Sequence, residues 1–242
     1  MRYALISDIH GNLEALNAVL AEIDKLHLDT ILCLGDVVGY GPNPNECVQS
    51  VRERAAVCLI RNHDEAALGR VDLEFFNYIA REAIEWTMRQ LNRESIAYLT
   101  GLPYTHEFEN NLIVHASPDE PRRWNYIISL EDAEQSFDAF GQQLCFIGHS
   151  HTPWVIDLPS QGRMQVRQDY PVAFREEHRY LINVGSVGQP RDRNPAAAFG
   201  IWDTVKHEYT LKRVSYDVGK TQKKIRAHGL PSFLADRLAS GQ

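Results

Sequence analysis

The stretch YALISDIHGN, residues 3–12, places a short apolar run almost directly before an aspartate and a histidine. The run 3–6 predicts a buried β-strand, because short apolar segments that end at a polar boundary are typical of strands covered on both faces. Asp8 and His10 then follow the carboxyl end of that strand. Both residue types bind metals, so the stretch predicts a ligand site at the edge of a sheet.

The first sixty residues alternate between strand-like and helical segments. Apolar residues recur at helical spacing over 13–23, a strand-like run spans 30–34, a second helical segment spans 45–54, and a third apolar run spans 55–60. This βαβαβ order predicts parallel strands in one sheet with helices packed on it, because parallel strands need long crossover connections.

The rest of the chain predicts a helical block followed by a strand-rich half. Residues 65–101 show helical periodicity throughout, and we interpret them as an insertion or cap. A helix is expected near 130–140, and the pair Asn110–Asn111 suits the positive φ angles of a hairpin turn. Further strands are expected at 104–109, 112–114, 144–147, 153–158, 180–184, 197–203 and 207–214, before two closing helical stretches.

Together these segments predict an α/β fold of the α+β type. Two packed mixed sheets flanked by helices would form a four-layer α/β/β/α sandwich, with the helical insertion near 65–101 attached to it. A chain of 242 residues lies within the size range of one such domain, so we expect a single domain over residues 1–242.

Composition narrows the functional class. With 44% hydrophobic and 24% charged residues the sequence is that of a globular protein, and no apolar run approaches the ~18 residues of a membrane span. We expect a cytoplasmic protein without a membrane partner, and four cysteines that are buried free thiols, since none forms a CxxC pair. The formal net charge of −7 argues against a nucleic-acid partner, because broad nucleic-acid binding depends on neutralising phosphates. Nothing in the sequence indicates an oligomeric state.

Polar residues that can bind metal follow five of the predicted strands. They are Asp8 and His10; Asp36; Asn62 and His63; His115; and His149 and His151. Singly, Asp36 also suits a turn, His115 a hydrogen-bonded strand end, and the pair at 149 and 151 a polar loop. All five together are better explained by one site, because the carboxyl ends of strands form the ligand crevice of open α/β sheets.

The donor atoms of this set are oxygen and nitrogen, with no thiolate. Such a set suits manganese first, and also iron, zinc, cobalt or nickel, rather than calcium or a structural zinc site. Seven ligands are too many for one ion with an open coordination position, but they suit two divalent ions that share a carboxylate. Two metal ions about 3.5–4 Å apart are a standard arrangement for phosphoester hydrolysis.

At five motifs the sequence resembles the calcineurin-like metallophosphoesterase superfamily. The motifs are Asp8-Ile9-His10, Gly35-Asp36, Asn62-His63-Asp64, His115 and Gly148-His149-Ser150-His151, in the order in which that family has them. The flanking segments 7–12 and 183–191 resemble the compact bacterial and archaeal phosphodiesterase branch. The resemblance therefore extends over most of the chain.

The resemblance implies a role for each of these residues. Asp8, His10 and His151 would hold one divalent ion, Asn62, His115 and His149 would hold the other, and Asp36 would bridge the two. Phosphorus would then be attacked in line by a hydroxide that bridges the metals. His63 would protonate the leaving oxygen or stabilise the transition state, and Asp64 is a candidate to support that histidine.

Departures from the family pattern concern the substrate contacts. Arg61 stands where the family usually has glycine, and it is either a bidentate phosphate contact or a structural or solvent-facing arginine. Arg191 is a second candidate for phosphate binding, against a role at the surface. The segment 35–41 lacks the second aspartate and the arginine of Gly-Asp-x-x-Asp-Arg-Gly, which weakens a protein-phosphatase interpretation.

The predicted function is that of a dinuclear metal-dependent phosphoesterase with a small phosphorylated substrate, expected first to be a phosphodiester. A dinucleoside polyphosphate hydrolase and a protein phosphatase are alternatives with the same chemistry. Tyr40, Trp124 and Tyr126 either pack in the structure or stack a nucleotide base or aryl group. An alternative of another class is a metal-binding scaffold without turnover, as in retromer-type relatives, but the presence of every ligand and of His63 argues against it. The acidic charge argues against a nuclease.

Overall fold

The computed structural model describes residues 1–242, which form two six-stranded sheets and eight α-helices. The strands are β1 (Arg2–Ile6), β2 (Thr30–Cys33), β3 (Val57–Cys58), β4 (Thr105–Phe108), β5 (Asn111–Val114), β6 (Leu144–Ile147), β7 (Trp154–Pro159), β8 (Gln165–Arg167), β9 (Val172–Ala173), β10 (His178–Asn183), β11 (Ala197–Asp203) and β12 (Glu208–Val214). The helices are α1 (Leu13–Lys25), α2 (Pro44–Arg54), α3 (Asn62–Ala67), α4 (Tyr78–Gln90), α5 (Arg93–Thr100), α6 (Leu130–Asp138), α7 (Val218–Ala227) and α8 (Ser232–Asp236), with 3-10 turns η1 (Leu73–Phe75) and η2 (Arg237–Ala239).

Both sheets are mixed. The first sheet has the strand order β3-β2-β1-β11-β12-β9, in which β1, β2 and β3 are parallel and β11 is antiparallel to β1. The second sheet has the order β4-β5-β6-β10-β7-β8, in which β5, β6 and β10 are parallel. The predicted βαβαβ beginning and the predicted pair of mixed sheets flanked by helices are therefore confirmed.

The first strand shows how the layers are held together. Tyr3 and Leu5 contribute to the core between the two sheets, whereas Ala4 and Ile6 lie in the core that α1 and α2 share with the first sheet. Successive side chains of a strand point to opposite faces, so a strand buried on both faces is apolar at every position. This explains why the opening apolar run contains no polar interruption.

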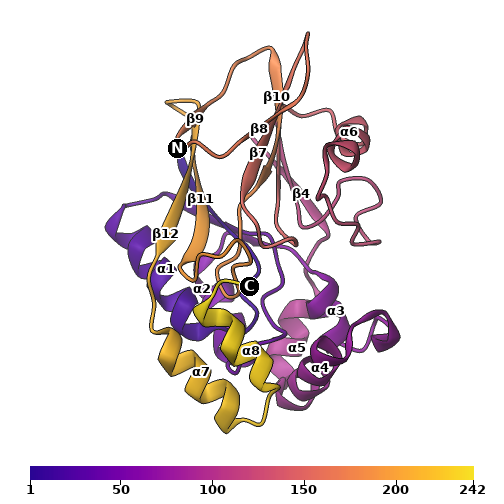
Figure 1. Cartoon of the computed structure of the whole chain (residues 1–242), viewed down its shortest axis with the longest axis vertical. Helices are drawn as coiled ribbons and strands as arrows, with labels where there is room; N and C mark the ends of the chain where they lie inside the picture. The colour runs from indigo at the N-terminus through magenta and orange to yellow at the C-terminus, as the bar shows by residue number, and fades with distance from the viewer.

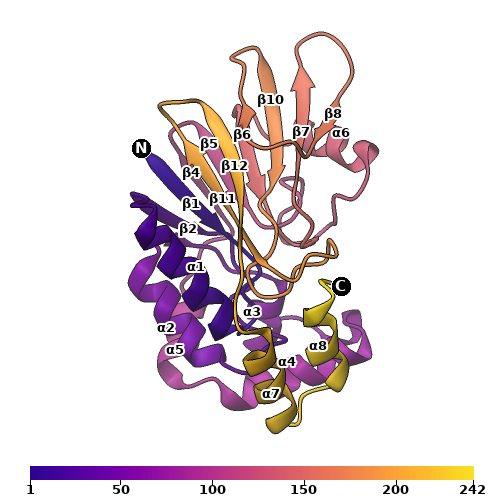
Figure 2. The same ribbon diagram turned by 60° about the vertical axis from the view of Figure 1, so that its left-hand side comes forward.

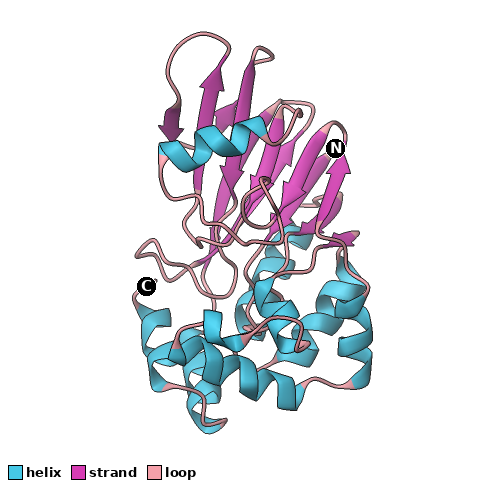
Figure 3. Cartoon of the chain, turned by 90° about the vertical axis from the view of Figure 1, so that its right-hand side faces the viewer, coloured by secondary structure: helices cyan, strands magenta, loops and turns pink.

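The outer face of the second sheet is covered by α6, as Figure 3 shows. Phe137 of this helix packs in one cluster with Val114 and Ile147 of the sheet. The helix begins with a capping box, in which the Ser129 hydroxyl accepts the Asp132 N–H and the Asp132 carboxylate accepts the Ser129 N–H. With α1 and α2 on the other outer face, the order of layers is helix, sheet, sheet, helix (Figures 1 and 2).

The helical block differs from the prediction in its continuity. Instead of one helical run over 65–101, the chain forms α3, η1, α4 and α5. Gly69 has a positive φ of 72° just beyond α3, and the side chains of Asn77 and Asn92 cap the starts of α4 and α5 by accepting main-chain N–H groups. Helical periodicity does not show these interruptions, because caps and turns depend on single residues.

Three smaller differences concern strands and turns. The run predicted over 55–60 pairs as a strand only at Val57–Cys58, and the short strands β8 and β9 were not predicted. The hairpin turn places positive φ angles at Glu109 and Asn110, one residue earlier than predicted.

The helical block packs against the C-terminal helices. Ala80 and Ala83 of α4 form one apolar cluster with Ile225 of α7 and Leu234 of α8. These helices lie together beyond the edge of the two sheets, as Figures 1 and 3 show. That residues 65–101 are an insertion in a single domain stays a prediction.

Two expectations from composition can be compared with the structure. The four cysteines are all buried and unpaired, as predicted. None of the helices combines the length and the apolar character that crossing a bilayer requires.

Candidate metal centre

The carboxyl ends of strands from both sheets meet at one edge, where the loops that follow them bring seven potential ligands together. We call these seven residues the ligand cluster: Asp8, His10, Asp36, Asn62, His115, His149 and His151. The first four follow β1, β2 and β3 of the first sheet, and the three others follow β5 and β6 of the second sheet. All seven are buried, at 8% exposure or less. The sequence-predicted ligands are therefore neighbours in space.

Each of the four histidines in the ligand cluster is fixed by a main-chain carbonyl. Because a carbonyl oxygen only accepts hydrogen bonds, the ring nitrogen that contacts it carries the proton, and the other ring nitrogen has a free lone pair. The four contacts are His10 Nδ1 to the Val38 oxygen (3.2 Å), His115 Nδ1 to the Leu34 oxygen (3.1 Å), His149 Nε2 to the Trp124 oxygen (3.0 Å) and His151 Nδ1 to the Gln189 oxygen (2.6 Å).

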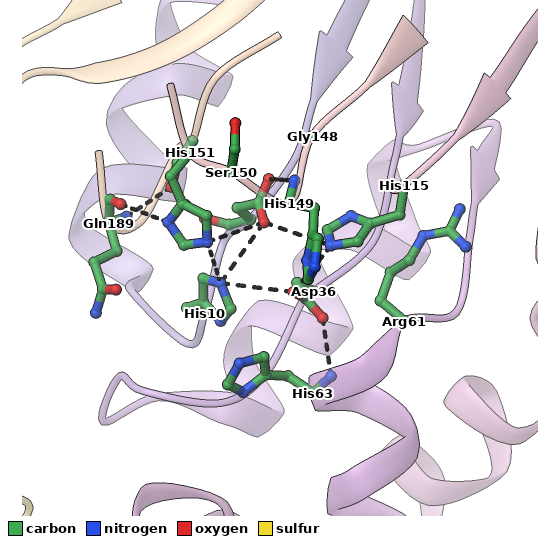
Figure 4. A network of polar contacts seen from close by, with 12 residues as sticks. His10, Asp36, Arg61, His63, His115, Gly148, His149, Ser150, His151 and Gln189 are labelled. Carbon is green, nitrogen blue, oxygen red and sulfur yellow. Dashed lines mark hydrogen bonds and ion pairs between the residues drawn. The ribbon is translucent and has the colours of Figure 1, made fainter. Parts of the chain in front are cut away.

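The free lone pairs of three of these histidines meet carboxylate oxygens or each other (Figure 4). His115 Nε2 lies 3.1 Å from Asp36 Oδ2, and His151 Nε2 lies 3.2 Å from both Asp8 Oδ1 and His10 Nε2. When the imidazoles are neutral, as metal binding requires, none of these contacts contains a proton that either partner donates. Lone pairs held this close repel one another unless a cation lies among them.

Several buried atoms of the ligand cluster have no hydrogen-bond partner at all. They are Asp8 Oδ1, Asp36 Oδ2, Asn62 Oδ1 and His115 Nε2. Buried polar atoms are almost always satisfied, so a group of unsatisfied acceptors at one place indicates a missing positive ligand. Within the cluster the ligand atoms form two groups of three, each with all atoms within 4.8 Å of one another: Asp8, His10 and His151, and Asp36, His115 and His149. A third group of the same kind joins His10 and Asp36 to His63. This donor set fits divalent metal ions.

Burial keeps the histidines in the neutral form that metal binding needs. It lowers the pKa of His149 to about 3 and that of His151 to about 4. The positive charge of Arg191 acts in the same direction on His151. Near neutral pH these two imidazoles therefore present lone pairs without first losing a proton.

The backbone at the ligand cluster is held in an unusual conformation. Five of its residues have positive φ angles between 49° and 66°, a region that residues other than glycine seldom adopt. They are Asp8, His10, Asp36, His149 and His151. Main-chain hydrogen bonds between the first two loops hold this geometry, from Asp8 N to the Gly35 oxygen (3.0 Å) and from His10 N to the Asp36 oxygen (2.9 Å). Backbone strain of this kind is concentrated at functional sites.

A third loop, over residues 183–189, supports the ligands and was not assigned this role from the sequence. The Asn183 side-chain amide donates to the main-chain oxygen of Gly148 (2.6 Å), and the Ser186 hydroxyl donates to the main-chain oxygen of Asp8 (2.9 Å). Gln189 supplies the carbonyl that orients His151. The conspicuous motif from Asn183 to Arg191 was the signal for this loop, but its residues offered no metal-ligand chemistry by which to recognise it.

His63 lies beside the ligand cluster rather than within it. Its main-chain N–H donates to Asp36 Oδ1 (3.1 Å), and its ring lies 4.5 Å from the Tyr40 ring and 5.3 Å from the Phe76 ring between centroids. Burial lowers the pKa of His63 well below its usual range, and the positive charge of Arg191 acts in the same direction. A neutral ring there can still donate one hydrogen bond.

Asp64 does not support His63 and has a different role. Its carboxylate accepts the main-chain N–H groups of Asp36 (3.0 Å) and Val38 (3.1 Å). It thereby fixes the loop that carries Asp36. Consecutive residues of a helix point about 100° apart, which is why adjacency in α3 does not bring the Asp64 carboxylate to the His63 ring.

Arg61 is fully buried behind the ligand cluster, and a substrate contact is not supported there. Its Nε donates to the Leu34 oxygen (2.7 Å) and its Nη1 to the Tyr104 oxygen (2.8 Å), so the guanidinium links two main-chain segments. Figure 4 shows it directed away from the cluster. Its stem fills the space beside Gly35, where a Cβ would come within 2.1 Å of Arg61 Cγ. A structural role, the alternative drawn from the sequence, fits this geometry.

Arg191 lies close to the ligand cluster on the other side. Its Nη2 donates to Gln189 Oε1 (2.9 Å), and the guanidinium lies 5.8 Å from the centre of the Tyr40 ring. Its charge acts on both His63 and His151. Arg191 is therefore the one of the two candidate arginines that is placed to meet an anion at the cluster.

A cavity of about 660 Å³ opens beside the ligand cluster. Asn62, His63 and His149 line it, so the cavity and the cluster form one continuous space. Tyr126 stacks on His149 at 4.0 Å between ring centroids, and it lines the same cavity with Tyr40. A group attached to a phosphate held at the cluster has room here.

Comparison with known proteins places this arrangement in a family. The sequence model of the calcineurin-like phosphoesterase superfamily domain matches residues 1–207. An uncharacterized protein of Methanocaldococcus jannaschii is 40% identical over 244 residues, which cover 99% of this chain and 98% of that protein. The crystal structure of a metallophosphoesterase from Sphaerobacter thermophilus is 41% identical, with a TM-score of 0.86 over 100% of this chain and 99% of that chain.

The fold itself extends to a more distant structure. A hypothetical protein of Pyrococcus horikoshii, 20% identical, has a TM-score of 0.80 with 100% of this chain and 98% of that chain covered. The family predicted from five short motifs is confirmed by matches that span nearly the whole chain. This chain belongs to the calcineurin-like phosphoesterase superfamily, a family of divalent-metal-dependent phosphoester hydrolases.

Proposed function

We propose that the protein hydrolyses phosphodiesters with two divalent metal ions. One observation carries the proposal: the ring nitrogens of three histidines that are not bonded to a main-chain carbonyl lie beside two carboxylates whose facing oxygens have no donor. Such a site is unfavourable when empty and becomes favourable when cations occupy it. The two groups of ligand atoms support two ions rather than one.

The grouping of the ligand atoms indicates which residues would hold each ion. Asp8, His10 and His151 would hold one ion, and His115, His149 and Asn62 would hold the other. Asp36 lies within 3.8 Å of both His10 and His115, so its carboxylate would be shared. Bound there, the ions would make a nucleophile available near neutral pH and neutralise charge on the phosphate.

The protein's own groups would complete the reaction around the phosphate. His63, neutral and at the rim of the ligand cluster, would donate a hydrogen bond to the leaving oxygen as its bond to phosphorus breaks. Arg191 would pair with a phosphate oxygen, because its guanidinium faces the same space. The Trp124 carbonyl would keep the His149 ring in the tautomer that binds metal.

The first candidate substrate is a small phosphodiester. Manganese is the first candidate for the metal, because the ligands are carboxylate and imidazole groups, and iron, zinc, cobalt and nickel bind the same donors. A nucleotide-type phosphoanhydride is the second candidate substrate, because the cavity beside the ligand cluster is lined by aromatic rings.

Substitution of one ligand and of His63 tests the proposal. In manganese-loaded protein, Asp36→Asn is expected to lose bound metal and to lower kcat/KM for bis(p-nitrophenyl) phosphate by at least about a hundredfold, since even outer-shell changes cost about 10–100-fold. His63→Ala is expected to keep the metal and to lower kcat by about 10²–10⁴.

Asp24→Asn is the matched control for the aspartate, because Asp24 lies at the surface in an ion pair with Arg54. It should change neither the metal content measured by mass spectrometry nor the rate. Stoichiometric metal without hydrolysis of mono- or diesters would favour a scaffold, and full activity in Asp36→Asn would overturn the proposed site.

A further inference from the structure

The cavity beside the ligand cluster is larger than a phosphate group alone would fill. Its volume of about 660 Å³ lies within the range of about 300–1,000 Å³ found for sites that enclose a small organic ligand. Its walls come from residues 70–77, between α3 and α4, and from the loop 122–126, in addition to the edge of the ligand cluster. We call this cavity the ring pocket.

Aromatic side chains dominate the apolar part of the ring pocket. Phe76 and Trp124 line it, and Phe75 at its mouth is 85% exposed. The Phe76 ring packs edge-on against His63, and the Trp124 carbonyl holds His149. A flat ligand lying on these side chains would therefore adjoin both the leaving-group side of the site and one ligand of the cluster. Nucleotide bases stack on aromatic side chains in this way.

Two arginines give the ring pocket an unpaired positive charge. Arg70 and Arg122 line it, and neither has a carboxylate partner, whereas the neighbouring Arg123 pairs with Glu120 (Nη1 to Oε2, 3.1 Å). The Arg122 guanidinium lies 4.2 Å from the centre of the Tyr104 ring. The charges of both Arg122 and Arg70 also act on the Tyr104 hydroxyl, so both guanidinium groups lie near that side chain.

The two carboxylates of the ring pocket are both engaged elsewhere. Glu65 accepts the Tyr104 hydroxyl, and Asp72 accepts the Glu74 N–H (2.9 Å) at the start of η1. Neither carboxylate forms an ion pair with Arg70 or Arg122. In a chain with a formal net charge of −7, two arginines left free at one cavity indicate an anionic ligand.

We propose that the ring pocket binds a nucleotide part of the substrate, with the base on Phe75, Phe76 and Trp124 and a second phosphate at Arg70 and Arg122. The inference rests on the proposed function, since it places the scissile phosphate at the ligand cluster. A simple aryl diester would occupy the rings but would leave both arginines without a partner. A nucleotide that carries a second phosphate satisfies rings and charges together, whether its scissile bond is a phosphodiester or, as in a dinucleoside polyphosphate, the phosphoanhydride that the proposed function gives as its second candidate.

Binding of adenosine diphosphate and of inorganic phosphate to the manganese-loaded protein tests this inference by isothermal titration calorimetry. Wild-type protein is expected to bind adenosine diphosphate at least tenfold more tightly than inorganic phosphate, because only adenosine diphosphate is large enough to reach the ring pocket. In Arg70→Gln/Arg122→Gln and in Phe75→Ala, the ratio of the two affinities is expected to fall several-fold or more. All three residues are exposed, so circular dichroism should show unchanged folding.

Arg163→Gln is the matched control. Arg163 is an exposed, unpaired arginine in the turn between β7 and β8, at the opposite end of β7 from the ligand cluster, and its removal should leave the ratio unchanged. A ratio of the two affinities near one in the wild type would overturn the proposed role of the ring pocket. Equal ratios in Arg163→Gln and in the double variant would overturn it as well.

The same preparations separate this inference from the proposed function. If the protein hydrolyses bis(p-nitrophenyl) phosphate and the ratio of the two affinities is near one, the inference about the ring pocket is overturned and the proposed function stands. A ratio that depends on Arg70 and Arg122, in protein that hydrolyses nothing, overturns the proposed function and supports the ring pocket.

Discussion

At the scale of single residues, Asp64 controls the position of the carboxylate that both proposed metal ions would share. Its two oxygens accept the main-chain N–H groups of Asp36 and Val38 in a fully buried setting. Asp64→Ala would leave both N–H groups without a partner, and each unsatisfied buried group costs about 1–3 kcal/mol. We expect the free energy of unfolding, measured by urea denaturation of metal-free protein, to fall by about 2 kcal/mol or more.

The metal affinity of Asp64→Ala should fall with its stability, because the Asp36 loop is no longer fixed. Asp138→Asn, at the end of α6, is a suitable control and should alter neither quantity. Loss of activity without loss of stability in Asp64→Ala would instead point to a direct role of Asp64 in catalysis.

The two histidines with strongly lowered pKa values predict how stability depends on pH. In the folded, metal-free protein the pKa values of His149 and His151 are about 3 and about 4, against about 6.5 in an unfolded chain. Below pH 6.5 the unfolded chain therefore binds protons that the folded protein does not. The contribution of these histidines to the free energy of unfolding is fully present above pH 6.5. It is lost as the pH falls toward 4, by about 1.4 kcal/mol per pH unit for each histidine.

Urea denaturation of metal-free protein at pH 7.5, 6.0 and 5.0 measures this slope. The variant His149→Asn/His151→Asn lacks both titrating rings and should show a much flatter profile. An equally steep profile in that variant would assign the pH dependence to other groups.

Sequence reasoning identified the candidate ligands, which the structure brings together, but not the residues that hold them in place. Aspartate and histidine after an apolar run carry a recognisable chemistry, whereas the contributions of Leu34, Val38 and Gln189 are main-chain carbonyls, which any residue has. For a related reason the sequence left two roles open for Arg61. A departure from a family pattern shows that a position is different, but not whether its side chain points into the site or behind it.

At the scale of elements, α6 is predicted to support the fold without affecting the chemistry. It covers the second sheet, and its capping box at Ser129 satisfies N–H groups at its start. Ser129→Ala should lower the free energy of unfolding by about 1 kcal/mol. The kcat for bis(p-nitrophenyl) phosphate at 25 °C should stay unchanged, because α6 provides no residue of the ligand cluster; a drop in kcat would show that this helix is coupled to the site.

Elements with strong periodicity were predicted well, and elements defined by tertiary pairing were not. The strand at 197–203 has the bounds that its apolar pattern predicts. By contrast, β9 comprises only Val172 and Ala173 and exists because it pairs with β12. Such short strands have no period of their own, so the local sequence does not indicate them.

At the scale of the whole molecule, the ligand cluster joins the two sheets. Asp8, His10, Asp36 and Asn62 come from the first sheet, and the three other ligands come from the second. Metal that binds only the folded protein should therefore stabilise it by about 2.7 kcal/mol at a free concentration 100-fold above Kd.

Thermal melting followed by circular dichroism, with and without manganese, measures this linkage. The melting temperature should rise with manganese concentration in the wild type and in Asp24→Asn, but not in Asp36→Asn. An equal rise in all three proteins would mean that manganese binds elsewhere.

The two-sheet architecture was predictable, but the partners of each strand were not. Alternating helical and strand-like segments indicate parallel strands and their covering helices. The antiparallel pairing of β1 with β11 joins residues almost 200 positions apart along the chain. No local pattern encodes that contact, and yet it places the loop that follows β10 beside Asp8.

The positive φ angles within the ligand cluster have a consequence for mutagenesis. At His10, His149 and His151, alanine would remove a ligand and also favour a different backbone conformation, so a loss of activity would have two inseparable causes. Asparagine tolerates the left-handed region far better, and it replaces aspartate at Asp8 and Asp36 with almost no change in shape. Asparagine scanning, rather than alanine scanning, is therefore the cleaner way to measure what each of these five side chains contributes.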